Sequence, residues 1–271
     1  MTATAHIATP TRASSDPLRR TSRAAGILYL LTFVSIPTLA LYNPVRENAD
    51  FVLGAGSDTG VLVAALSEVV VALAGIGTAI VLFPVVKRQS ETAALGFVTA
   101  RVLEAALILV GVVSVLSLVT LRNDVAGTAG ADPASLVTTG HTLLATYDWA
   151  FLLSQSLMPV FNALFLGYVM YRSGLVPRIL PIIALVGAPL LLASDIAVFS
   201  GVYEKGALLD GLAVIPIAVF EFSLGVYLLV RGFRPSSPLM AQQKAAVPVP
   251  ALVPAPRAGV SGREERGVDV S

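Results

Sequence analysis

Six long apolar stretches alternate with short polar segments along the chain, and this alternation is its dominant pattern. A helix needs roughly 20 mainly apolar residues to cross the hydrocarbon core of a bilayer. Because backbone polar groups must be paired inside lipid, such stretches are expected to be helices. The pattern therefore predicts an all-α integral membrane bundle of six transmembrane helices, at residues 24–42, 60–83, 92–121, 142–171, 179–200 and 208–230.

The basic residues are divided unequally between the two sides of these six helices. Of the 18 Lys and Arg residues, all but four lie in the two tails and in the gaps that follow the second and fourth stretches. The opposite side carries only Arg46, Arg122 and Lys205, and Arg101 lies inside a stretch. Cytoplasmic loops are enriched in Lys and Arg, so we expect a multi-pass protein of the cell membrane with both termini in the cytoplasm.

Aromatic residues of the fourth stretch fit the same arrangement. Tyr147 and Trp149 lie toward one end, and Tyr168 and Tyr171 toward the other. The distance from residue 149 to residue 168 is roughly 28 Å along a helix, close to the thickness of the hydrocarbon core. We therefore interpret these aromatic residues as anchors at the two membrane interfaces.

The two tails differ in composition from the apolar core. Residues 1–23 and 232–271 are rich in Pro, Ala, Ser and charged residues and contain too little apolar surface to order themselves. We expect a disordered cytoplasmic N-terminus (1–23), a transmembrane domain (24–231) and a disordered cytoplasmic tail (232–271). The first apolar run is longer than the core of a usual signal peptide, which favours an uncleaved helix. Asp132 and Pro133 are suited to begin a short interfacial helix before the fourth span.

Composition excludes several kinds of chemistry. The chain has 55% hydrophobic and 13% charged residues, no Cys and only two His, His6 and His141. Thiolate metal sites, a cysteine nucleophile and disulfides are excluded, and a His-based metal centre or haem is not expected. The sequence also lacks the common zinc-hydrolase, phosphate-loop and serine-hydrolase motifs. We therefore predict no catalytic residues, no metal site and no cofactor.

Ionisable residues inside the predicted spans are the candidates for function, because burying a charge in lipid is costly. Asp148, Asp195 and Asp210 fall near the ends of their helices, where we expect them to reach water. Four other ionisable residues lie deeper within their predicted spans and form the candidate polar cluster: Arg101, Glu104, Glu221 and Glu68.

Arg101 and Glu104 are three residues apart and therefore share one helical face. One guanidinium facing Glu104, Glu221 and Glu68 cannot neutralise three carboxylates, so at least one glutamate is expected to carry a proton. Two interpretations remain open: a polar contact that fixes helix packing, or a site inside the bundle that responds to protons or a ligand. Gln155 and Asn162, on either side of Pro159, are candidates for a polar seam beside this cluster.

Two motifs resemble a known family. Residues 100–106 contain an Arg-x-x-Glu pair, Arg101 and Glu104, and residues 173–180 contain Ser-Gly-x-x-Pro-Arg-x-Leu. With these motifs the chain resembles a bacterial membrane family, the domain-of-unknown-function family numbered 4386, over residues 19–234. The resemblance implies a multi-pass membrane topology and no particular activity.

Three functions are consistent with these features. The first is a structural or accessory membrane protein in which Arg101, Glu104 and Glu221 set the helix packing. The second is a small-solute or proton-coupled transporter that uses the same glutamates, and the third is an intramembrane enzyme, which the missing motifs disfavour. The expected partner is the lipid bilayer and not a nucleic acid, while protein partners and oligomeric state are not indicated.

Overall fold

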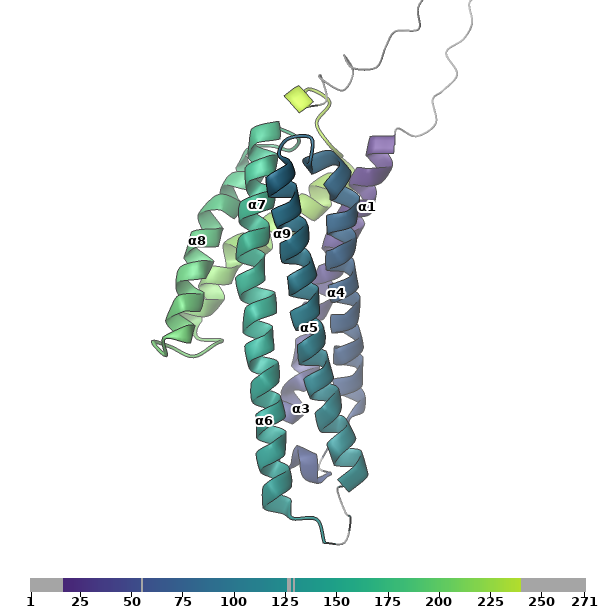
Figure 1. Cartoon of the computed structure of the whole chain (residues 1–271), viewed down its shortest axis with the longest axis vertical. Helices are drawn as coiled ribbons and strands as arrows, with labels where there is room; N and C mark the ends of the chain where they lie inside the picture. Colours follow the sequence, from purple (N-terminus) through teal and green to yellow (C-terminus); the bar gives the residue numbers. More distant parts are fainter. Residues whose placement is uncertain (1–16, 55, 126–127, 129, 240–271) are drawn as a thin grey trace, which may run out of the picture.

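The computed structural model describes residues 17–54, 56–125, 128 and 130–239, and all regular structure in this part of the chain is helical (Figure 1). This confirms the all-α prediction. The main helices are α1 (Pro17–Leu31), α4 (Thr59–Val86), α5 (Glu91–Val125), α6 (Pro133–Leu152), α7 (Met158–Ser173), α8 (Ile179–Phe199) and α9 (Leu208–Val230). Short helices α2 (Ser35–Thr38) and α3 (Asn43–Glu47) follow α1.

Six helical segments of the described chain are long and apolar enough to cross a membrane, the number predicted from sequence. Their length and composition indicate a multi-pass membrane protein. Large apolar side chains such as Leu66, Ile80 and Leu208 are exposed on the outside of the bundle, as expected for a surface in contact with lipid. The six segments are Pro17–Glu47, Thr59–Val86, Glu91–Val125, Pro133–Ser173, Ile179–Phe199 and Leu208–Val230.

The fourth segment is longer than predicted and contains a widened turn. Asp132 accepts hydrogen bonds from the N–H groups of Ala134 and Ser135 and caps α6, which runs directly into the span. The expected separate interfacial helix is therefore wrong. Between α6 and α7 the chain forms one π-helical turn, η4 (Leu153–Leu157), because Pro159 has no N–H to donate to the carbonyl four residues earlier.

Both predicted boundaries between tail and bundle need correction. Helix α1 begins at Pro17, because Leu18 packs against the core and Ser22 is fully buried. After α9, Phe233 and Leu239 are buried in the same core, and the Arg234 N–H donates to the Leu175 carbonyl at 2.8 Å. The expectation of disorder is therefore wrong for 17–23 and 232–239. Residues 1–16 and 240–271 lie outside the described part of the chain.

Helix α5 lies among α4, α6 and α7, whereas α9 packs chiefly against α1 and α8. The α1–α9 contact depends on Gly26, since a Cβ there would lie 2.6 Å from the Leu229 nitrogen. Helices α7 and α8 are joined by a tight turn in which Gly174 has a φ of 64° and its N–H donates to the Met170 carbonyl. The first and last described residues lie at the same end of the bundle, which we call the terminal end (Figure 1).

Candidate functional site

The described residues contain three buried polar clusters inside the bundle. The arginine cluster comprises Arg101, Glu104, Glu221 and Asn162. The Glu68 cluster comprises Glu68, Tyr42, Tyr147 and Gln155. The aspartate cluster comprises Asp195, Asp210, Lys205, Ser156, Ser194 and Tyr203.

In the arginine cluster, one guanidinium serves two carboxylates. Arg101 is only 2% exposed, and its Nη1 donates to both carboxylate oxygens of Glu104, at 3.1 and 3.0 Å. Its Nη2 donates to Glu221 Oε1 at 2.5 Å. These bonds join α5 to α9 across the interior. Charge-assisted bonds of this kind are among the strongest in proteins, and they offset part of the cost of removing the guanidinium from water.

Neighbouring side chains complete the enclosure of this cluster. The Asn162 amide of α7 donates to Glu104 Oε2 at 2.6 Å. The rings of Tyr29 and Phe97 lie 5.2 and 5.8 Å from the guanidinium carbon of Arg101, within the range of a cation–π contact. The arginine cluster thus draws together α1, α5, α7 and α9. It holds one cation against two carboxylates.

Glu68 does not join the arginine cluster, contrary to the sequence-based expectation. It is 2% exposed and accepts three hydrogen bonds, from Tyr42 Oη at 2.8 Å, Tyr147 Oη at 3.1 Å and Gln155 Nε2 at 2.9 Å. All three donors are neutral. The expected single seam is also divided, because Gln155 binds Glu68 whereas Asn162 binds Glu104.

The aspartate cluster corrects a second expectation. Asp195 and Asp210 were expected to reach water, but both are buried, at 0% and 3% exposure. The loop between α8 and α9 folds over them, so that Lys205 Nζ lies 3.1 Å from Asp210 Oδ1 and 3.1 Å from Ser156 Oγ. Ser156 in turn donates to Asp195 Oδ1 at 2.6 Å. Asp148 alone behaves as expected: it is half-exposed and pairs with Arg46.

A scan against family models decides which family the chain belongs to. The model described as "Domain of unknown function (DUF4386)" matches residues 24–232, more than half of the chain. The chain is a member of the DUF4386 family. The resemblance inferred from residues 100–106 and 173–180 is thereby confirmed, and the matched range contains all three polar clusters. No curated protein and no solved structure matches the chain.

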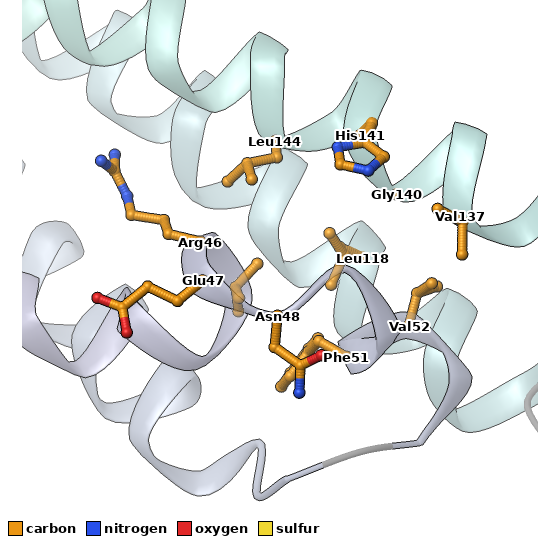
Figure 2. Close-up of a pocket in the computed structure, with 11 residues that line it drawn as sticks. Arg46, Glu47, Asn48, Phe51, Val52, Leu118, Val137, Gly140, His141 and Leu144 are labelled. Carbon is orange, nitrogen blue, oxygen red and sulfur yellow. The ribbon is translucent and has the colours of Figure 1, made fainter.

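The DUF4386 chain also has a small pocket between helices that lie toward the end of the bundle opposite the terminal end (Figure 1). Figure 2 shows the residues that line it. The pocket has a volume of about 180 Å³ and lies between α3 and its neighbours on one side and α6 on the other. Arg46 and Glu47 line it from α3, and His141 and Leu144 line it from α6. Arg46 also lies over the Tyr147 ring at 5.4 Å, so one side chain contacts both the pocket and the Glu68 cluster.

Sequence reasoning missed several residues of these clusters in the DUF4386 protein. Tyr147 was interpreted as an interfacial anchor, but it is buried and bonds Glu68, whereas Trp149 is half-exposed as expected of an anchor. Lys205 was counted only as a loop charge. No signal in the sequence joined Tyr147 to Glu68, because the two residues lie on different helices and are separated by 79 positions. Among the described residues, no three His, Asp or Glu side chains gather as potential metal ligands.

Proposed function

We propose that this DUF4386 protein is a non-enzymatic structural or accessory protein of the cell membrane, with both termini in the cytoplasm. The topology is supported by the distribution of basic residues, since the terminal end carries the tails and the gaps rich in Lys and Arg. The proposed role is supported by the arginine cluster, whose charged groups bond one another within the bundle.

One observation carries this proposal: the Arg101–Glu221 pair links α9 to the central helix α5. Helix α9 packs chiefly on α1 and α8, so this pair adds a directional contact to the middle of the bundle. Polar residues between transmembrane helices act in this way, because an unpaired partner in hydrocarbon is costly.

The Glu68 cluster favours a second candidate, a small-solute or proton-coupled transporter. Among the described residues its carboxylate accepts hydrogen bonds only from neutral groups, and the nearby cation Arg46 lies over the Tyr147 ring and forms no salt bridge with Glu68. Arg46 connects it through the Tyr147 ring to the pocket at the opposite end of the bundle. Carboxylates inside membrane spans often belong to proton relays.

The two candidates are separated by comparing stability with proton binding. Glu221→Gln, Glu104→Gln and Glu68→Gln would be made in the full chain and purified in detergent. Thermal unfolding and potentiometric titration across the neutral pH range would be measured on each. The structural role predicts lower unfolding temperatures and titration curves that overlay the wild-type curve. A folded variant that loses a proton-binding step in this range would favour the transporter and reject the structural role.

A further inference from the structure

An apolar groove lies between α8 and α9 near the terminal end of the bundle. It has a volume of about 420 Å³, which falls within the size range of small-molecule sites. Figure 1 shows the two helices close together near their connecting loop and farther apart toward the terminal end. The residues that line its length include Ile179, Leu180, Phe222, Val226 and Val230.

Local packing explains why the groove opens where it does. Midway along the pair, a Cβ on Gly187 would lie 2.7 Å from the Pro216 Cβ, so the two helices are in contact there. Beyond this point α8 runs toward α7, whereas α9 runs toward α1. The exposed side chains of Ile179 and Val230 place the groove on the outside of the bundle, where lipid would surround it.

One end of the groove is cationic. Arg231, the C-cap of α9, lines the groove there and is exposed. Arg19 donates to the carbonyls of Val230 and Arg231 at 2.7 and 2.6 Å, which satisfies two carbonyls at the negative end of the α9 dipole. Within the described chain no group bonds the Arg231 guanidinium, and no acidic residue lines the groove.

We propose that this groove binds one acyl chain of an anionic phospholipid and that Arg231 binds the lipid phosphate. The polarity of the groove matches that of a phospholipid. Its apolar length suits an acyl chain, and the cation at its end lies at the level of the proposed cytoplasmic headgroups. Any lipid tail in the bilayer can fill the groove, so the chains provide little selectivity. Preference for anionic over zwitterionic lipid arises at Arg231.

The expected selectivity follows from one arginine near an anionic headgroup. Such a contact changes affinity by about five-fold, equivalent to ~1 kcal/mol. Native mass spectrometry of the purified full chain, titrated with phosphatidylglycerol or with phosphatidylcholine, would measure it. We expect the first lipid bound to favour phosphatidylglycerol by about this factor.

Two variants and a control test the location. Arg231→Gln is expected to abolish the preference for phosphatidylglycerol, and Val226→Trp, which fills the groove, is expected to weaken binding of both lipids. Arg172→Gln removes an exposed arginine at the end of α7, outside the groove, and is expected to keep the preference. Equal affinity of the wild type for the two lipids, or an unchanged preference in Arg231→Gln, would overturn the proposal. Because Arg231 is exposed, that variant is expected to fold even if Val226→Trp does not.

Discussion

Replacing Arg101 by Met would leave the Glu104 and Glu221 carboxylates inside the bundle without their cation. Three hydrogen bonds are lost, two to Glu104 and one to Glu221. Removing one partner of a buried ion pair typically costs about 3–5 kcal/mol, because the remaining charge is unpaired. For a chain of this size each kcal/mol lowers the unfolding temperature by about 2–4 °C, so we expect a fall of roughly 6–20 °C.

The assay is thermal unfolding of the purified full chain in one detergent, followed by circular dichroism. Arg101→Lys is the matched control for charge, since it keeps the cation but loses the planar fork whose two Nη groups bind Glu104 and Glu221 separately. We expect its unfolding temperature to lie between those of the wild type and Arg101→Met.

A triple variant separates unpaired charge from lost packing. Arg101→Met combined with Glu104→Gln and Glu221→Gln removes the cation and both carboxylates together. A buried neutral amide without a partner costs less than a buried carboxylate without a cation. The triple variant is therefore expected to recover part of the stability that Arg101→Met loses. If Arg101→Met unfolds at the wild-type temperature, or if the triple variant is no more stable than Arg101→Met, the structural role of this cluster is refuted.

Three further outcomes are expected. Gly26→Ala places a Cβ against the α9 backbone and should cost about 1–3 kcal/mol in stability, whereas Gly211→Ala, which meets nothing within 4 Å, should cost none. Tyr147→Phe removes a donor from buried Glu68 and should lower the unfolding free energy by about 1–3 kcal/mol, whereas Tyr168→Phe on the exposed surface should not; equal losses would contradict this account. The proposed topology predicts which introduced cysteines an impermeant thiol reagent labels on intact cells, and the reverse pattern would reject it. The labelled positions should be Asp50→Cys and Asp124→Cys, and the protected ones Gln89→Cys and Ser236→Cys.

The number of apolar helices could be predicted because each span must by itself supply roughly 20 mainly apolar residues to cross the bilayer. Arg101 and Glu104 could be placed on one face by their spacing alone. The hydrogen-bond donors to Glu68 could not be predicted, because they depend on where α6 and η4 lie against α4. Asp195 was expected to be exposed to water because it lies near a helix end. The loop that carries Lys205 folds back over that end of the bundle and covers it.

Composition alone also could not predict that residues 232–239 are ordered, because their order depends on contacts with the folded bundle. Average polarity predicts whether a segment can form a core of its own, whereas Phe233 and Leu239 use a core already provided by the helices. These two apolar side chains dock an otherwise polar segment against the bundle. Their target, beside the turn between α7 and α8, exists only in the folded chain.

The widened turn η4 has a consequence for insertions and deletions. A π-helical turn holds one residue more than an α-helical turn, while the helix on either side keeps its own facing. Deleting one residue there is expected to leave Tyr147 and Asn162 directed at their present partners. Only one of Gln155 and Ser156 would then still reach its carboxylate. The extra residue is thus what allows the consecutive residues Gln155 and Ser156 both to reach an acid, Glu68 of α4 and Asp195 of α8.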